Sequence, residues 1–315
     1  MKIVVTGGAG FIGSHVVRAL LREGHEVTVL DDFNDFYEPA IKRSNLASVQ
    51  DQIEVAEVDL RDEATTQALF QRVRPEVTFH LAARAGVRPS ILQPKLYLET
   101  NVNGTFHVLE ASRLSGCQRM IFASSSSVYG LATTIPFHEE LPLPQTLSPY
   151  AATKLAGEQL CGNFAYLYGM QITCLRFFTV YGPGQRPDLA IHSFTDAITH
   201  GHPIKQFGDG STRRDYTYID DIVQGVMGAL TYDKKQFDIF NLGGHKTTSL
   251  SELIASLEMA IGRKAIIEKL PEQKGDMPRT YANISKAQNL LGYAPQTPLE
   301  VGIPKFVKWY RARAF

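Results

Sequence analysis

A tyrosine and a lysine four residues apart, Tyr150 and Lys154, form the pair best suited to proton transfer in this 315-residue sequence. In a helix they would lie one turn apart on the same face. The ammonium would favour the phenolate, so the tyrosine could titrate closer to neutrality and remove a proton from a hydroxyl group. The spacing alone is weak evidence, but it follows four serines, residues 124–127. A serine hydroxyl there could hydrogen-bond the same substrate oxygen, although the run could also be a solvated loop.

A second chemical feature is the glycine turn formed by Gly7, Gly10 and Gly13, which follows the first apolar run. The first two glycines permit a tight turn close to a pyrophosphate, and the third permits close packing of the next helix. The N-terminus of that helix would bind the phosphates. Asp31 ends the second apolar run, near the ~20-residue offset at which an acid binds the adenosine ribose. An acid there repels a 2′-phosphate, which favours NAD over NADP; a glycine turn that binds nothing is the alternative.

These residues must be positioned by alternating strands and helices. The sequence predicts strands at 3–5, 27–30, 53–58, 77–81, 120–123 and 172–180 and helices at 14–24, 63–73, 97–115 and 151–168. Such alternation implies right-handed crossovers and a mostly parallel sheet, that is, a Rossmann-type, doubly wound α/β fold. Ligands of such sheets bind at the carboxyl ends of the strands, where the glycines, Asp31 and the serines fall.

The composition changes after residue 180, where loop-rich segments precede a smaller α/β substrate-binding lobe. A strand at 237–242 should rejoin the sheet, and helices are expected near 251–261 and 284–290. The predicted division assigns 1–180 plus about 215–245 to the nucleotide-binding domain, and about 181–214 plus 246–315 to the lobe.

Bulk properties exclude several classes of protein. Lysine plus arginine and aspartate plus glutamate both number 32, so the net charge of zero gives no footprint for nucleic acid or an anionic membrane. No apolar stretch reaches 18 residues, and the first strand begins at residue 2, so we expect no leader or membrane span. Three scattered cysteines, Cys117, Cys161 and Cys174, indicate a reducing, cytoplasmic compartment. The histidines lack metal-ligand spacing, so no metal is expected.

The sequence resembles the extended short-chain dehydrogenases/reductases, a family that includes nucleotide-sugar epimerases, dehydratases and decarboxylases. The matching segments span nearly the whole chain in the family's order: 6–13 (TGGAGFIG), 59–60 (DL), 80–83 (HLAA), 101–105 (NVNGT), 126–130 (SSVYG), 148–154 (SPYAATK), 176–183 (RFFTVYGP), 214–221 (RDYTYIDD) and 241–244 (NLGG).

The resemblance implies roles for individual residues. Tyr150 would be the catalytic base, Lys154 would hold the nicotinamide ribose, and Ser125 would be the hydroxyl partner of Tyr150. The implied contacts to NAD are Gly7, Gly10, Phe11, Ile12, Gly13, Asp31, Asp32, Asn34, Asp59, Leu60, Leu81, Ala82, Ala83, Asn101, Tyr150, Lys154 and Phe178. The implied contacts to a sugar nucleotide are Arg88, Ser125, Ser127, Thr179, Arg186, Ala190, Lys205, Phe207, Arg214 and Asp276.

Particular positions favour one branch of the family. Ser125, Ser126 and Ser127 stand where dehydratases carry Thr-Asp-Glu, so the acid pair is absent, and Ser127 stands where uronate decarboxylases carry glutamate. Segments 177–190, 122–128 and 85–88 resemble UDP-glucuronic acid 4-epimerases, in which Thr179 and Arg186 would meet the carboxylate. The implied reaction converts UDP-glucuronate to UDP-galacturonate with NAD through a 4-keto intermediate.

Other readings stay open. They are a UDP-glucose or UDP-N-acetylglucosamine 4-epimerase, a UDP-glucuronate decarboxylase, and a non-catalytic NAD-binding sensor or scaffold. Helices 97–115 and 151–168 resemble the pair that forms a four-helix dimer interface in relatives, so a homodimer is expected.

Overall fold

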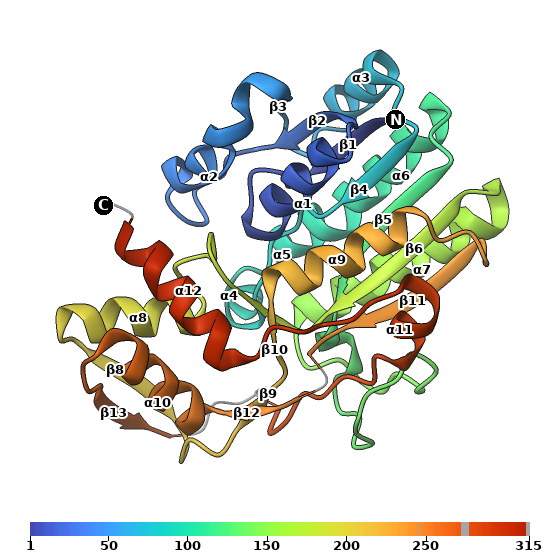
Figure 1. Ribbon diagram of the computed structural model, residues 1–315. Coiled ribbons are helices and arrows are strands. Elements are labelled where there is room, and N and C mark those ends of the chain that lie inside the picture. The colour runs from blue at the N-terminus through green and yellow to red at the C-terminus, as the bar shows by residue number, and fades with distance from the viewer. Residues whose placement is uncertain (245, 272–276, 313–315) are drawn as a thin grey trace.

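Seven parallel strands form the central sheet, in the order β11-β6-β5-β4-β1-β2-β3 (Figure 1). The computed structural model describes residues 1–244, 246–271 and 277–312. The strands are β1 (Lys2–Thr6), β2 (Glu26–Asp31), β3 (Glu54–Glu57), β4 (Val77–His80), β5 (Arg119–Ser125), β6 (Gln171–Phe177) and β11 (Phe237–Leu242). This confirms the predicted doubly wound fold, including the strand that rejoins the sheet after residue 236.

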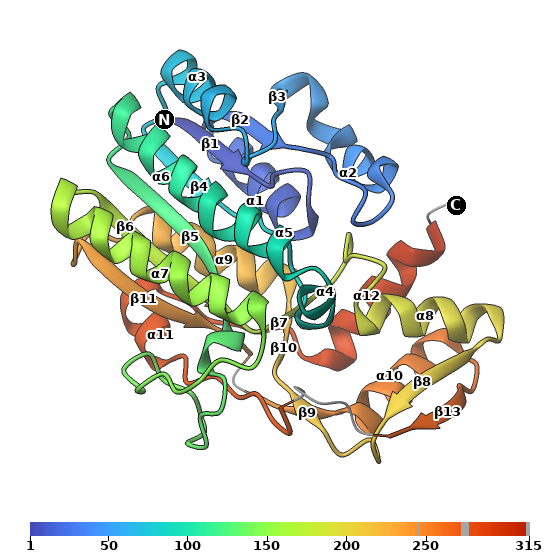
Figure 2. The same cartoon turned by 180° about the vertical axis from the view of Figure 1, so that it is seen from behind.

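Helices cover both faces of the sheet. One face carries α1 (Phe11–Arg22), α9 (Ile219–Leu230) and α11 (Ser285–Leu291). The opposite face carries α3 (Glu63–Val73), α6 (Gly104–Ser115) and α7 (Pro149–Tyr168), which lie side by side in Figure 2. The inner strands are apolar on both sides: Val4 and Phe122 pack toward α3, α6 and α7, whereas Val5 and Ile121 belong to the core on the other side. Such burial explains why the strands lack an alternating polar pattern.

Short helices connect the main elements. They are α2 (Pro39–Leu46), η1 (Ala47–Gln52), α4 (Val87–Leu92), α5 (Pro94–Leu98), the π-turn η2 (Glu99–Asn103) and η3 (Ser126–Tyr129). The predicted helix 97–115 is therefore interrupted by a π-turn. The predicted strand 172–180 is also divided, because Phe178 leaves the sheet between β6 and β7 (Thr179–Tyr181).

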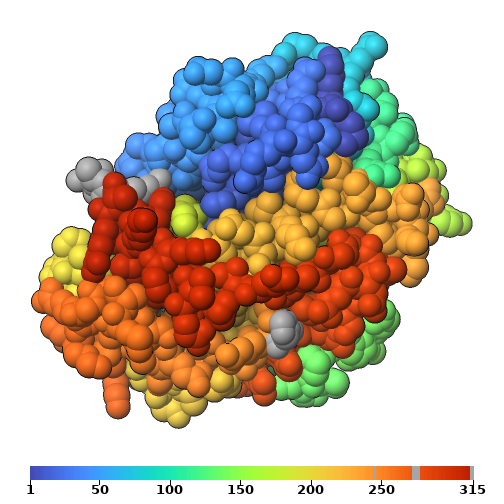
Figure 3. Space-filling view, viewed as in Figure 1, coloured from blue at the N-terminus to red at the C-terminus, as the bar shows by residue number. Residues whose placement is uncertain are grey.

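A smaller group of elements lies beside the carboxyl ends of the central strands (Figure 1). Its helices α8 (Ala190–His200), α10 (Leu250–Ile261) and α12 (Leu299–Ala312) adjoin the parallel pair β8 (Pro203–Phe207) and β13 (Ile266–Leu270). Two further pairs join the regions: β7 with β10 (Tyr216–Tyr218), and β9 (Arg213–Arg214) with β12 (Thr248–Ser249). Figure 3 shows the amino-terminal part (blue) at the top of one face and the carboxyl-terminal part (orange and red) across its middle and lower left.

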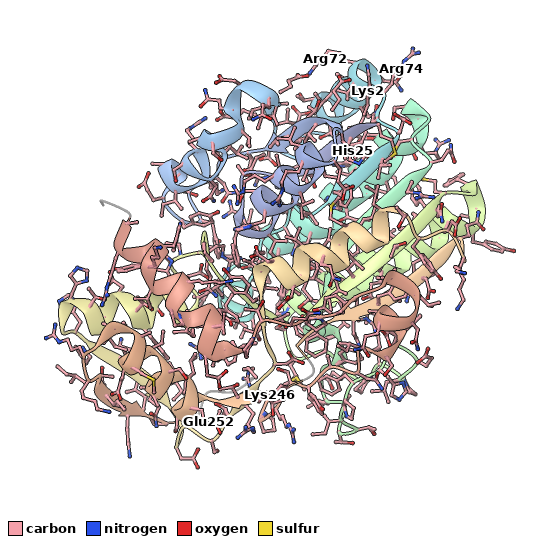
Figure 4. The ribbon with its side chains drawn as sticks, viewed as in Figure 1. Lys2, His25, Arg72, Arg74, Lys246 and Glu252 are labelled. Carbon is pink, nitrogen blue, oxygen red and sulfur yellow. The ribbon has the colours of Figure 1, made fainter. Side chains whose placement is uncertain are left out.

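Local sequence signals fix several helix starts. Ser148 accepts a hydrogen bond from the Ala151 N–H at 3.2 Å, with Pro149 in the first turn, so α7 begins where the candidate base must be held. Ser249 and Glu252 form a reciprocal capping box at α10 (Glu252 is labelled in Figure 4). Within the described residues, no helix combines the length and apolar character needed to cross a membrane.

Candidate active site

The glycine turn brings two loops of the sheet edge into close contact. Gly7 has a φ of 68°, and a Cβ there would lie 2.7 Å from the Ala82 Cα. A Cβ on Gly13 would lie 2.1 Å from the Gly7 carbonyl oxygen, so α1 can approach the turn only with glycine at that position. Gly10 is the N-cap of α1, which Phe11 and Ile12 open without an acidic side chain. The turn therefore presents backbone N–H groups and the positive end of a helix dipole, which suits a pyrophosphate.

Asp31 ends β2 beside this turn. Its carboxylate accepts hydrogen bonds from the backbone N–H groups of Ala9, at 3.1 Å, and Phe33, at 3.0 Å. Burial raises the pKa of Asp31, and the ammonium of Lys42, 4.0 Å away, opposes that rise. The acid is thus held rigidly at the end of its strand, as a ribose ligand must be.

Asp32 and Asn34 lie next to Asp31 and share the same lysine. Asp32 Oδ1 accepts from the Asn34 N–H at 3.1 Å, and Lys42 Nζ lies 4.0 Å from that oxygen. Lys42 also donates to the Asn34 carbonyl at 2.9 Å. Burial lowers the pKa of Lys42, with the two aspartates opposing this. Our sequence reasoning missed Lys42, although a lysine soon after a pair of aspartates was a signal for such a contact.

The segment after β4 forms the opposite wall of the turn. Leu81 N–H donates to the Thr6 carbonyl at 3.1 Å, and Ala82 N–H donates to Thr6 Oγ1 at 3.2 Å. His80 is fully buried between Thr6 Oγ1, at 2.7 Å, and Thr105 Oγ1, at 2.9 Å. Burial lowers the pKa of His80 to about 3, so a neutral imidazole ties β1, β4 and α6 together. Ala83, the next residue along, stays half-buried.

Asn101 lies in the π-turn between α5 and α6 and connects this wall to α7. Its side chain accepts from the Arg84 N–H at 2.8 Å, donates to the Arg84 carbonyl at 2.9 Å, and donates to Thr153 Oγ1 at 3.0 Å. Because π-turns are often found at functional sites, the irregular helix is consistent with an expected cofactor contact here.

Asp59 and Leu60 follow β3 farther along the same sheet edge. Asp59 holds the Arg61 side chain, with Nε 3.0 Å from Oδ1, and this bond lowers the pKa of Asp59. Leu60 packs beneath α6, where a Cβ on Gly104 would approach its Cβ to 3.1 Å. A surface cleft of about 470 Å³ is lined by Asp59, Arg61, Asp62, Glu99, Asn103 and His107.

The predicted catalytic residues are brought together at the carboxyl end of β5. The Tyr150 phenol lies close enough to Ser125 for that side chain to lower its pKa. Ser127 donates to Ser125 Oγ from its N–H, at 3.2 Å, and from its Oγ, at 3.0 Å. Lys154 lies one turn along α7 and donates from Nζ to the Ala123 carbonyl at 2.7 Å. A candidate base and a lysine thus lie on one stripe of α7, facing the strand end that carries the candidate hydroxyl partner.

The electrostatics of the pair differ from our expectation. Burial raises the pKa of Tyr150, while the nearby Ser125 side chain and the charge of Arg186 lower it. Burial also lowers the pKa of Lys154 to about 8, against the nearby carboxylate of Glu158, which raises it. We expected Lys154 to bring Tyr150 toward neutrality, but burial outweighs the favourable interactions of the protein alone. A positively charged group bound beside the phenol would lower its pKa further.

Phe178 and Thr179 follow Phe177, the residue of β6 that pairs with Ser125 in the sheet. The Phe178 ring is buried, with its centroid 6.4 Å from that of Tyr129. Thr179 opens β7 and donates its N–H to the Asp215 carbonyl at 3.1 Å. Leaving the sheet at Phe178 therefore brings a half-buried threonine next to the strand end that carries Ser125.

Arg186 reaches the same place from the loop between β7 and α8. Asp188 accepts from its Nε at 2.9 Å and from its Nη2 at 2.7 Å, and the guanidinium lies over the Phe36 ring at 5.2 Å. Its charge lowers the pKa values of both Tyr150 and Tyr97, whose ring is packed edge-on against that of Tyr150. Sequence reasoning missed Phe36 and Tyr97; the aromatic run around residue 36 was the available signal.

The other predicted substrate contacts lie toward the smaller lobe. The Arg88 guanidinium of α4 lies over the Phe207 ring of β8, at 4.7 Å, and so connects the two regions. Arg214 donates to the Met277 carbonyl at 2.7 Å. Lys205 and Ala190 are exposed at β8 and the start of α8. Asp276 lies outside the described residues.

The model of the NAD dependent epimerase/dehydratase family matches residues 3–243. UDP-glucuronate 4-epimerase 3 of Arabidopsis thaliana is 43% identical, over 98% of this chain and 76% of its own.

Two solved structures are similar over the full length of the chain. The UDP-glucuronic acid 4-epimerase of Bacillus cereus, solved with UDP-glucuronic acid and NAD, has a TM-score of 0.91, with 37% identity over 99% of both chains. A UDP-glucose 4-epimerase of Thermotoga maritima, solved with UDP-glucose, also has a TM-score of 0.91, with 34% identity over 99% of both chains. With a family match over most of its length and these relatives, this chain belongs to the NAD dependent epimerase/dehydratase family.

Proposed function

We propose that this protein is an NAD-dependent 4-epimerase that interconverts UDP-glucuronate and UDP-galacturonate. The observation that carries the proposal is the position of Arg186 near Tyr150 and Ser125, close enough for its charge to lower the pKa of Tyr150. A base for a sugar hydroxyl and a cation for a carboxylate thus lie side by side. A hexose substrate would need the first group, whereas a uronate uses both.

The residues at the sheet edge fit NAD. The glycine turn leaves room for the pyrophosphate, and Asp31 lies where the adenosine ribose would bind. Lys154 would hold the nicotinamide ribose, and Asn101 with the segment 81–83 would form the wall of the pocket. When bound, NAD supplies a site that accepts the C4 hydride of the sugar and returns it.

In the proposed reaction Tyr150 removes the proton from the C4 hydroxyl while Ser125 holds the same oxygen. The resulting 4-keto sugar turns within the pocket and presents its other face. Tyr150 then returns the proton to the C4 oxygen, so one phenol serves as base and as acid. Lys154, buried below Tyr150, fixes the geometry of this end of α7.

The 4-keto form of a uronate is a β-keto acid, which loses CO₂ when the breaking bond aligns with the carbonyl. We propose that Thr179 and Arg186 hold the carboxylate away from that alignment. Arg186 donates to Asp188 from Nε and Nη2, and the described residues include no hydrogen-bond partner for Nη1. Nη1 could therefore donate to the carboxylate of the substrate.

Thr179→Val should therefore raise the share of UDP-pentose among the products several-fold, because one hydrogen bond to the carboxylate is lost. Mass spectrometry of the product mixture measures that share. A variant with wild-type rate and no extra UDP-pentose would remove Thr179 from this role.

The nucleotide would bind toward the smaller lobe. In this proposal Arg214 contacts the pyrophosphate, and Lys205 and Phe207 border the base. The lobe comprises about 181–214 plus 246–315, and the NAD-binding domain comprises 1–180 plus about 215–245. Helix α11 falls within the lobe in this division, yet it packs against β11 of the large sheet and against α9, which covers that sheet.

The proposal is tested by incubating the protein separately with UDP-glucuronate and UDP-glucose and following both by NMR. UDP-galacturonate should appear from the first, with little turnover of the second. Preferential conversion of UDP-glucose would identify a UDP-glucose 4-epimerase, a reading that the similarity to the Thermotoga maritima enzyme supports. UDP-pentose as the main product would identify a decarboxylase, and the absence of any product would identify a non-catalytic binder.

We also propose that the protein is a homodimer that works in the cytoplasm. Apolar side chains are exposed along α6 and α7, among them Phe106 and Tyr168. Their helices lie next to each other on one outer face (Figure 2). All three cysteines are free and buried, which suits a reducing compartment.

A further inference from the structure

Helix α7 holds three consecutive residues at the end of β5 through one stripe of its surface. Tyr150 lies near Ser125, whose side chain lowers the pKa of the phenol, and Lys154 Nζ donates to the Ala123 carbonyl at 2.7 Å. The third contact lies between them: Ser124 Oγ donates to Glu158 Oε1 at 2.5 Å. Residues 150, 154 and 158 are spaced by four, so they follow one face of the helix.

The helix and strand are closely packed at this place. A Cβ on Gly157 would lie 2.5 Å from the Phe122 ring, so glycine is required for α7 to approach β5. The Lys154 ammonium lies over the same ring, at 5.1 Å. Ser124 directly precedes Ser125, so a change in the contact between Glu158 and Ser124 should shift the position of Ser125.

Glu158 is itself held from the neighbouring strand. Arg176 of β6 donates from Nε to Oε1 and from Nη2 to Oε2, both at 2.8 Å, and both side chains are almost fully buried. The guanidinium also lies over the Tyr129 ring at 4.9 Å, and Tyr129 donates to Asn241 Oδ1 at 2.7 Å. The carboxylate thus has a fixed orientation set by β6, independent of the substrate site.

Stability alone is a poor explanation for this arrangement. A buried ion pair costs desolvation that its attraction often fails to offset, so well-packed apolar residues could serve the core as well. Unlike apolar residues, the Glu158–Arg176 pair offers a carboxylate in a fixed orientation. That carboxylate can accept a hydrogen bond from one side chain of β5 at a defined position.

We propose that Glu158 is a positioning residue for the catalytic pair. Clamped by Arg176, it fixes Ser124 and thereby sets the distance between the Ser125 hydroxyl and the Tyr150 phenol. The proposal rests on the epimerase function argued above, because it assigns Glu158 an effect on the base of that reaction.

The consequence should be visible as a change in the titration of Tyr150. The titratable and charged groups around this phenol are Lys154 on its own helix, Tyr97 of α5, and Arg186 with its partner Asp188. These stay in place when Ser124 changes. The Ser125 side chain lowers the pKa of Tyr150, so moving that side chain away from the phenol raises it.

The decisive variant is Ser124→Ala, which leaves the Glu158–Arg176 pair intact and removes only its link to the strand. We expect kcat at pH 7 to fall about tenfold, with KM and NAD content within twofold of wild type. The loss should shrink as the pH rises, because the displaced phenol still ionises at higher pH. Ser112→Ala, which removes another buried hydroxyl bonded to Thr78, is the matched control and should leave the profile unchanged.

A second readout does not depend on turnover. The phenol of Tyr150 can be titrated by NMR with ¹³Cζ-tyrosine, its signal assigned by difference from Tyr150→Phe. An upward shift in Ser124→Ala supports the proposal even if the wild-type protein epimerises a different sugar or none, in which case only the proposed function fails. An unchanged titration, or an activity loss that is equal at every pH, overturns the positioning role. Glu158→Gln should act in the same direction, and if it fails to fold, Ser124→Ala decides.

Discussion

In the function proposed here, the single residue Arg186 serves both specificity and acid–base chemistry. Its guanidinium is held between Asp188 and the Phe36 ring, and its charge lowers the pKa of Tyr150. Family resemblance pointed to this residue as a carboxylate ligand. Its influence on the base follows only from the folded loop, which returns from β7 toward α7.

Arg186→Gln should therefore have two effects. The KM for UDP-glucuronate should rise about tenfold or more, because a hydrogen bond to a charged group is lost. The pKa of Tyr150 should also rise, so the acid limb of the kcat profile moves to higher pH. Steady-state kinetics from pH 6 to 10 measure both. Arg72→Gln, an exposed arginine on α3 (Figure 4), is the control, and equal behaviour of the two variants would contradict the assignment.

At the scale of elements, sequence patterns predicted those turns, strands and helices that depend on interactions between residues close in sequence. The glycine turn, β2 and the helix 63–73 could be predicted because turn geometry, burial and capping act within a few residues. The π-turn at 99–103 and the break at Phe178 could not, since they depend on contacts with distant segments such as Arg84 and Leu242. Helix α12 was missed because Pro304 interrupts its pattern.

The same limit applies to the site. Motif spacing identified Tyr150, Lys154 and Ser125 as a group, because strand ends of a parallel sheet converge. It could not show that Lys154 would donate to the Ala123 carbonyl or that burial would raise the pKa of Tyr150. Those facts arise from the depth at which α7 packs on β5.

His80, which links β1, β4 and α6, leads to a prediction about how the stability of the protein depends on pH. Its pKa is about 3 in the folded protein and 6.5 ordinarily, so the unfolded chain binds more protons between these values. The free energy of unfolding should thus fall by a few kcal/mol as the pH drops from about 6.5 toward 3. Urea titrations at several pH values should show a smaller decrease for His80→Asn. The control is Leu69→Ala, a core change in α3, which should lower the free energy of unfolding by about 2–5 kcal/mol at every pH. If the free energy of unfolding of His80→Asn changed with pH as steeply as that of the wild type, the role of His80 would be contradicted.

At the scale of the whole molecule, the sheet separates two kinds of surface. One edge carries the site between the two regions, and the outer face of α6 and α7 carries exposed aromatic side chains that include Phe106, 40% exposed, and Tyr168, 48% exposed. Burying such side chains against a second copy removes apolar area from water without obstructing the site.

Phe106→Glu with Tyr168→Glu should convert the proposed dimer into a monomer, because the charges could not be desolvated at an apolar interface. Light scattering after size exclusion measures the mass. Met259→Glu, which alters an even more exposed apolar residue on α10, should leave the dimer intact. A monomeric wild-type protein, or a double variant that remains dimeric, would refute this use of α6 and α7.

The central claim is that the Tyr150 phenol moves the proton at C4 of a UDP-uronate, and Tyr150→Phe tests it most directly. The variant keeps the ring and its packing against Tyr97, so it should fold and retain NAD. With UDP-glucuronate and NMR detection, we predict that formation of UDP-galacturonate slows by about 10²- to 10⁴-fold. A folded, NAD-loaded Tyr150→Phe protein that epimerises UDP-glucuronate at the wild-type rate would contradict the account.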